Sequence, residues 1–382
     1  MDKILNDSID NIINNTKLLI YKENSLLFDR LRFDDDETFL EPLLFCYFYS
    51  KKNTFYSVAI LEQLMQGYFI NKGDVKIEKI LNDDQLAYIP NMGYYTNSVK
   101  KDSVIKTEDI YNINHSKIGL IKNFSPILDV IFQSIVKNYE KEEIIEFNSI
   151  CSDKNITFLK NAFKFIEIAS PEYYNYIKMC CKNILMFKSN PEHFNSFATI
   201  NAHGIAFLNV YQENYNEVFF VDDLAHQTGH IIMNTFWFDK KKHFLIDENF
   251  EIKICTDNPK EYRSFFILFH ALYTYYASVS CLENCIDKDF FDDDQNKEAI
   301  ARIGFYERKY RYDLECFAKV CEHFKGIDNV IKEDSKVLYS QINKKFLQLE
   351  KRWIKVISPM SFTNQSYNFD FTKFKKENNY EC

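Results

Sequence analysis

Residues 222–232 read DDLAHQTGHII and lie within a longer segment, residues 216–237, whose apolar side chains recur at helical spacing. His226 and His230 are four residues apart, so both imidazoles project from one face of the predicted helix, one turn apart. Two neutral imidazoles in this arrangement can bind one metal ion. Two buried histidines at the same spacing can also be ordinary core residues held by hydrogen bonds. The pair alone leaves both interpretations open.

The residue that follows the first histidine separates this segment from the zinc peptidases. In the peptidase pattern HExxH, the Glu is the general base that activates the metal-bound water. Position 227 is Gln, whose amide cannot take up that proton. The sequence therefore keeps the ligand pair and lacks the hydrolytic base, which disfavours peptide hydrolysis and favours a redox metal.

A third ligand has to come from farther along the chain, and two candidates stand out. Glu248 follows His230 by 18 residues and would complete a set of two histidines and one carboxylate; its alternative is an ordinary surface Glu. His270 lies inside the apolar run FFILFHAL, residues 265–272, where a buried imidazole needs a partner. We favour His270. His203 could lie near the site, beside a predicted strand. The remaining histidines are expected at the surface: His115, His193, His243 and His323.

Composition excludes several classes of protein. The 382 residues include 47 Lys+Arg and 55 Asp+Glu, a net charge of −8 that disfavours nucleic-acid binding. No run of about 18 apolar residues is present, and the first residues do not read as a signal peptide, so we expect a cytoplasmic protein without a membrane segment. The ten cysteines form no CxxC pair and are expected to be reduced core residues. Cys281 and Cys285 could share a helix face as metal ligands, but packing is the favoured role.

The expected fold is mainly α and multi-helical, with a small β element beside a zincin-like metal-binding helix. Only 8 Gly and 7 Pro occur, which argues against a turn-rich β protein. We expect residues 82–107 to be a loop, because Pro, Asn and Gly interrupt any periodicity. Short strands are predicted at residues 196–200 and 204–210. The predicted long helices in the second half are residues 216–237, 261–285, 296–324 and 333–356.

Three regions are predicted along the chain. Residues 1–140 form a helical N-terminal region, and residues 141–358 form a helical catalytic domain that carries the HxxxH pair. Residues 359–382 are polar and aperiodic, which predicts a loose tail or an extension that contacts a partner.

Residues 196–325 resemble the HExxH-motif peptide-modification proteins of bacterial natural-product clusters, a group that includes 2-oxoglutarate-dependent peptide β-hydroxylases. Three features, in this order, carry the resemblance. A strand-like run HGIAFL, residues 203–208, precedes the metal helix with its HQTGH, residues 226–230. Residues 257–259, DNP, then lead into a helix that contains FHA, residues 269–271. The next helix, residues 302–324, carries several Arg, as it does in that family.

The resemblance implies an Fe(II) ion held by His226, His230 and His270, with 2-oxoglutarate and O2 as co-substrates. The far carboxylate of the keto acid would need a cation, for which Arg suits through bidentate hydrogen bonds. Four arginines of the two downstream helices are candidates for this role: Arg263, Arg302, Arg308 and Arg311.

The implied reaction is hydroxylation at the β-carbon of a residue in a ribosomally made precursor peptide. The strand-like run around Gly204 could pair with that peptide edge to edge. Gln227 could donate a hydrogen bond to the keto acid, the peptide or dioxygen; its alternative is a structural bond to a nearby backbone carbonyl. Two other functions stay open: a divergent, zinc-binding metallopeptidase-like protein, and a non-catalytic peptide-binding scaffold.

Overall fold

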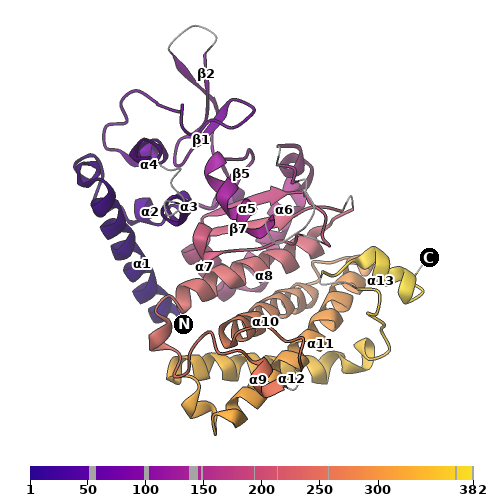
Figure 1. The fold of residues 1–382 in the computed structure, drawn as a ribbon. Helices are drawn as coiled ribbons and strands as arrows, with labels where there is room; N and C mark the ends of the chain where they lie inside the picture. Colours follow the sequence, from indigo (N-terminus) through magenta and orange to yellow (C-terminus); the bar gives the residue numbers. More distant parts are fainter. Residues whose placement is uncertain are drawn as a thin grey trace. The chain divides into compact units, whose positions relative to one another are not determined.

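The computed structural model confirms a mainly α, multi-helical fold in which about 60% of the residues are helical. The chain divides into two compact units (Figure 1). Unit 1 comprises Met1–Lys160 with Tyr176–Glu213, and unit 2 comprises Asn161–Asn175 with Asn214–Cys382. The structure describes residues 1–50, 57–98, 103–136, 145–147, 149–192, 194–212, 214–256, 258–365 and 368–380.

The division between the units differs from the boundaries predicted at residues 140 and 358. It falls inside two helices, α6 (Ser149–Ala169) and α7 (Pro171–Cys180). Each of these helices contributes one part to unit 1 and the other part to unit 2. A continuous helical pattern carries no signal for such a division, so the sequence could not place it.

The helices of unit 1 bury apolar stripes against a shared core. In α1, the side chains of Leu5, Ile12 and Ile20 are buried at helical spacing. Asn24 caps the short turn that follows by accepting a hydrogen bond from the Leu26 backbone N–H, 3.2 Å. The helices that lie wholly in unit 1 are α1 (Asp2–Glu23), α2 (Asp36–Phe39), α3 (Pro42–Ser50), α4 (Val58–Met65) and α5 (Asp129–Val136).

Unit 1 also contains an antiparallel sheet of three strands, which corrects the prediction of a loop at residues 82–107. Its order is β1-β2-β3, and Asn91 and Gly93 take positive φ angles in the turn between the first two strands. The strands are β1 (Leu86–Ile89), β2 (Gly93–Asn97) and β3 (Val104–Glu108). The side chains of β3 are mostly exposed, so the hydrophobic alternation that signals a strand is missing there.

A second sheet of unit 1 has the order β4-β5-β6-β7. Its β5, β6 and β7 pair in parallel, and all residues of β6 and β7 are buried, as is typical of parallel strands. The prediction of a strand at residues 204–210 is therefore confirmed, whereas the segment at 196–200 contributes a single bridge from Phe197 to Phe207. The strands are β4 (Tyr111–Asn112), β5 (Gly119–Ile121), β6 (Asn183–Phe187) and β7 (Ile205–Asn209).

Unit 2 is built from long helices, as predicted. Asn216 caps α8 by accepting from the Val218 N–H, Ser264 caps α10, and a capping box of Asp292 and Gln295 begins α11. In Figure 1, α8, α10 and α11 lie side by side, consistent with their mutual contacts. The helices are α8 (Glu217–Phe236), α9 (Lys253–Thr256), α10 (Phe265–Asp287), α11 (Asp293–His323), α12 (Glu333–Ile357) and α13 (Phe371–Glu377).

The apolar helix α10 forms the centre of unit 2. Within the described part of the chain, it is the one helix long and apolar enough to cross a membrane, and most of that stretch is buried inside the protein. Its burial against α8 and α11 accounts for its composition and is compatible with a soluble protein.

The described residues of the C-terminal region pack against the helices rather than forming a loose tail. Phe369 and Phe374 are buried, and the Phe369 ring lies 5.6 Å from that of Phe305 on α11. The same Phe369 ring faces the guanidinium of Arg302 at 5.1 Å. Aromatic residues widely spaced in a polar stretch produce no periodic pattern, so this packing could not be predicted from the sequence.

Candidate metal centre

Helices α8 and α10 carry the three histidines predicted as metal ligands, and they pack closely where those residues lie. Gly229, next to His230, faces α10: a Cβ atom on it would lie 3.3 Å from the Thr274 Cγ2 atom. His270 is one turn before Thr274 on α10. The glycine therefore lets the two helices approach at the level of His230 and His270.

The three imidazole rings form a contiguous row. The ring centroids of His226 and His230 are 5.1 Å apart, and those of His230 and His270 are also 5.1 Å apart. His226 and His230 are partly exposed, whereas His270 is buried. Helix α10 thus places the His270 ring beside that of His230, and the role of the three histidines as metal ligands remains a prediction.

The surroundings of the row keep all three imidazoles neutral. Burial lowers the pKa of His230 to about 4. Burial, with a smaller contribution from His230, holds the pKa values of His226 and His270 well below the usual range. Neutral imidazole is the form that binds a metal ion, so the row needs no deprotonation near neutral pH.

Two nitrogen atoms of the row are buried without a hydrogen-bond partner, namely His226 Nδ1 and His270 Nε2. Buried polar atoms are normally satisfied, so such atoms call for an explanation such as an ion. In the described part of the chain, however, no three His, Cys, Asp or Glu residues have their donor atoms gathered around one point. Binding of one ion by all three imidazoles would therefore require rotation of their side chains.

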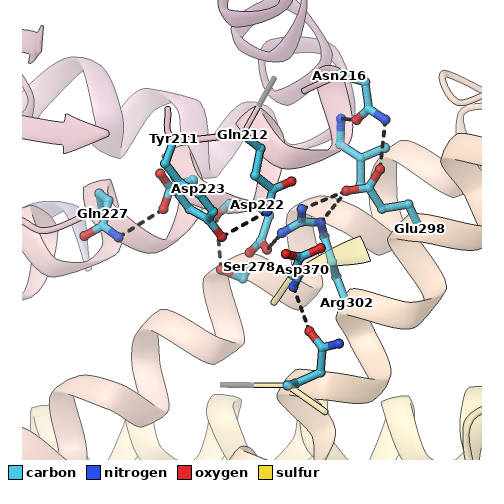
Figure 2. Close-up of polar contacts among 12 residues, drawn as sticks. Tyr211, Gln212, Asn216, Asp222, Asp223, Gln227, Ser278, Glu298, Arg302 and Asp370 are labelled. Atoms are coloured by element: carbon cyan, nitrogen blue, oxygen red, sulfur yellow. Dashed lines mark hydrogen bonds and ion pairs between the residues drawn. The ribbon is translucent and has the colours of Figure 1, made fainter. Parts of the chain in front are cut away.

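Gln227 makes a bond that the sequence analysis did not anticipate. Its Nε2 donates to Asp223 Oδ1 at 3.1 Å, one turn earlier on α8, rather than to a backbone carbonyl (Figure 2). Its Oε1 is buried and has no partner among the described residues. Gln227 is thus held by a carboxylate, and its carbonyl oxygen remains available as an acceptor.

Glu248, the alternative third ligand, lies beyond the row of imidazoles. Its carboxylate pairs with Lys240 at 3.7 Å, and the Lys240 ammonium lies 4.1 Å from the centroid of the Phe266 ring. The Phe266 ring in turn lies 4.9 Å from that of His270. His270 contacts His230 directly, whereas Glu248 is separated from His270 by this lysine and phenylalanine. The arrangement favours His270.

Arg302, one of the four arginines predicted for the keto acid, is buried between two protein carboxylates. Its Nη1 donates to Asp222 Oδ2 at 2.9 Å, and its Nε and Nη2 donate to Glu298 Oε1 at 2.9 and 2.7 Å (Figure 2). Burial raises the pKa of Asp222, and Arg302 opposes that shift. These bonds assign Arg302 to holding α8 against α11, which corrects its proposed role.

The other three arginines differ in how far they are occupied. Arg263 forms a fork with Asp313, at 2.7 and 2.8 Å, and also bonds to Glu261. Arg311 pairs with Glu307 and Glu350. Arg308 donates to the Met360 carbonyl oxygen at 2.7 Å and stacks on Phe362, and it forms no ion pair with the described residues. Arg308 is thus the member of the set without an ion pair in the described part of the chain, and it is exposed and contacts the C-terminal region.

Two residues of α11 beside the row were not among the predicted site residues. The Tyr306 ring stacks on that of His226, with centroids 5.8 Å apart. Lys309, one turn later, is partly buried, and desolvation lowers its pKa to about 8. Its charge also contributes to lowering the pKa of His226. Tyr306 and Lys309 are three residues apart, so both lie on one face of the helix. This spacing can be recognised in the sequence, but only arginines were considered as cations for the keto acid.

The remaining histidines and the cysteines are distributed as follows. His203 belongs to unit 1, where its ring lies 5.5 Å from that of Phe45. His115 and His323 are exposed as predicted, and His193 lies outside the described residues. His243 is buried against Phe236, so its prediction as a surface residue was wrong. The nine described cysteines are free, and most are buried, including Cys281 and Cys285.

Comparison with known proteins adds no relative to these observations. No family model matches the chain, and no curated protein matches it. The function of the chain therefore has to be inferred from its residues and their geometry.

Proposed function

We propose that this chain is an iron(II)- and 2-oxoglutarate-dependent hydroxylase that acts at the β-carbon of a residue in a ribosomally made precursor peptide. The observation that carries the proposal is the row of three neutral imidazoles, from His226, His230 and His270, with two buried nitrogen atoms that lack partners. The resemblance of residues 196–325 to peptide-modification proteins supports the choice of metal and co-substrate.

Two of the three ring-to-ring separations are compatible with a single metal ion. An ion bound at ~2.1 Å to an imidazole nitrogen lies about 3.2 Å from the ring centroid, so neighbouring ligands at roughly 90–110° have centroids about 4.5–5.2 Å apart. The two measured separations, both 5.1 Å, fall in this range. No ring contact joins the third pair, His226 and His270, among the described residues, so binding of one ion by all three imidazoles requires at least one of these two side chains to move.

The residues around the row favour oxygenation over hydrolysis. Gln227 cannot accept a proton from water, and its bond to Asp223 fixes the amide in place. Bound iron with 2-oxoglutarate and O2 supplies the oxidation: one oxygen atom enters a C–H bond as C–OH, and the other enters succinate as CO2 leaves. The chain itself has to bind the peptide and the keto acid and exclude water.

The far carboxylate of the keto acid needs a positively charged side chain as its partner, and the ion pairs of the structure reduce the number of candidates. Arg263, Arg302 and Arg311 already serve carboxylates of the protein. Arg308, without a carboxylate partner in the described part of the chain, remains a candidate. Lys309 is a second candidate because of its position, since it lies on the helix whose Tyr306 contacts His226 and its charge lowers the pKa of His226.

The proposal is tested by measuring the metal content of the protein and then its visible absorption after 2-oxoglutarate is added. Protein purified without oxygen and reconstituted with Fe(II) is expected to bind one iron per chain and to develop a weak visible band with 2-oxoglutarate. His226→Ala and His230→Ala should each abolish stoichiometric iron binding, because each removes a ligand. His323→Ala is the matched control, since His323 is exposed at the end of α11.

Each outcome has a distinct meaning. If the His226→Ala variant binds as much iron as the wild type, the proposed metal site is contradicted. Tight zinc binding without a 2-oxoglutarate band would favour a metallopeptidase-like protein, and absence of any metal would favour a peptide-binding scaffold. Co-expression with candidate peptides would then identify the substrate by the mass of one added oxygen atom.

A further inference from the structure

Unit 1 contains a cavity of about 370 Å³ that lies outside the row of histidines. This volume is in the range of sites for small molecules. Its wall includes Glu37, Glu41, Tyr68, Tyr88, Lys182 and Asn183. These residues come from α2, the α2–α3 connection, the 3-10 turn after α4, strand β1 and the start of β6, so the cavity depends on the packed fold of the unit.

Glu41 is the unusual member of this wall. It is buried, and its two carboxylate oxygens each accept one hydrogen bond, from the Tyr68 hydroxyl at 2.7 Å and from the Leu43 backbone N–H at 3.1 Å. It forms no ion pair with any residue that the structure describes. A buried carboxylate normally has a cation as a partner, and each oxygen here keeps a further lone pair. Burial accordingly raises the pKa of Glu41.

The two lysines that line the cavity form ion pairs with Glu37 rather than with Glu41. Lys182 pairs with Glu37 at 2.8 Å and Lys117 pairs with the same group at 3.5 Å. These two ion pairs lower the pKa of Glu37 although its burial opposes them. With Asp35 also in the lining, three carboxylates face two ammonium groups. The lining therefore has a formal net negative charge, and Glu41 forms no ion pair among the described residues, although the charge of Lys182 lowers its pKa against the effect of burial.

The rest of the wall suits a small organic cation. Tyr68 and Tyr88 also line the cavity, and their hydroxyls are engaged with Glu41 and Asn183 respectively. Aromatic faces next to a carboxylate attract an ammonium group. An anion would face the unpaired carboxylate, and a neutral hydroxyl would leave its charge uncompensated.

We propose that this cavity binds a small molecule with a primary ammonium group, which forms an ion pair with Glu41 and lies against Tyr68 and Tyr88. The site is separate from the proposed metal centre and does not depend on it. Its ligand class follows from one buried carboxylate that lacks a cation in a cavity of small-molecule size.

Isothermal titration with matched probes tests the proposal on the full-length protein. Putrescine and 1,4-butanediol share one carbon chain and differ in carrying ammonium or hydroxyl groups. We expect saturable binding of one putrescine per chain and at least tenfold weaker binding of the diol. Equal affinity for the two probes, or no binding of putrescine, would overturn the proposal without recourse to any variant.

Variants then locate the binding. Glu41→Gln keeps the shape of the side chain and should weaken putrescine binding at least tenfold. Glu62→Gln is the control, because Glu62 is an exposed residue of unit 1 that pairs with Arg30 at 3.7 Å. Circular dichroism would confirm that each variant is folded. Unchanged putrescine affinity in a folded Glu41→Gln variant would place the amine elsewhere and overturn the assignment.

Discussion

Replacing Arg302 by methionine tests whether this arginine holds unit 2 together or is free to bind the keto acid. The substitution keeps much of the side-chain volume and removes the guanidinium. Asp222 and Glu298 would then be buried carboxylates without their cation, since the wild-type bonds to Arg302 are 2.7–2.9 Å long. Loss of one partner from a buried ion pair typically costs about 3–5 kcal/mol. We expect a loss of this size in the free energy of unfolding at pH 7.

Urea unfolding followed by tryptophan fluorescence measures this loss, because both tryptophans, Trp237 and Trp353, lie in unit 2. Lys297→Met is the matched control on the same helix, since its ion pair with Asp294 is exposed at the surface. It should change the midpoint little.

The pH dependence separates a lost ion pair from lost packing. In the Arg302→Met variant, the two buried carboxylates should have pKa values above those of the unfolded chain. The folded variant therefore takes up protons as the pH falls, and the difference from the wild type should shrink between pH 7 and about pH 5. If Arg302→Met unfolds like Lys297→Met at every pH, the structural role is refuted and Arg302 returns as a candidate for the keto acid.

Three further predictions concern single residues. His270→Ala should reduce bound iron far more than Glu248→Ala, as measured by metal analysis; the reverse order would establish Glu248 as the third ligand. Gln227→Glu should not create zinc-dependent cleavage of casein, and it should lower thermal stability because the new carboxylate faces Asp223, its present partner at 3.1 Å. Burial lowers the pKa of His203 to about 4, so stability that is complete above about pH 6.5 is lost as the pH falls toward 4; His203→Asn should flatten this slope in thermal scans by up to about 3 kcal/mol.

The long helices of unit 2 could be predicted because their sequences contain both periodicity and end signals. The segment predicted as residues 216–237 is α8 (Glu217–Phe236), with Asn216 as its cap. Most strands of unit 1 lacked such signals, and β7 (Ile205–Asn209) is the exception that could be predicted. The run NILMF of β6 is buried on both faces, and a short continuous apolar run cannot be distinguished from a buried helix. The exposed strand β3 shows no apolar face, so only its pairing with β2 defines it.

Some residues of the candidate site could also be predicted from the sequence, whereas the roles of others could not. His226 and His230 follow from one local spacing, and His270 follows from its place in an apolar helix. The roles of the arginines depend on which carboxylates lie opposite them. The partners Asp222 and Arg302 are 80 residues apart in the chain, and no local pattern connects them. The sequence alone therefore could not distinguish an arginine that pairs with protein carboxylates from an arginine that is available to bind a ligand.

The row of imidazoles depends on a contact that involves none of its members. His230 lies beside His270 where Gly229 of α8 packs closely against Thr274 of α10. A residue with a larger side chain at position 229 would move the helix axes apart at the level of these two rings, while His226 and His230 would keep their spacing along α8. The HxxxH pattern thus predicts two ligands from the helix itself, whereas the third ligand depends on a glycine that shares the motif. The residue between the histidines that matters for assembling the row is Gly229, and the one that matters for its chemistry is Gln227.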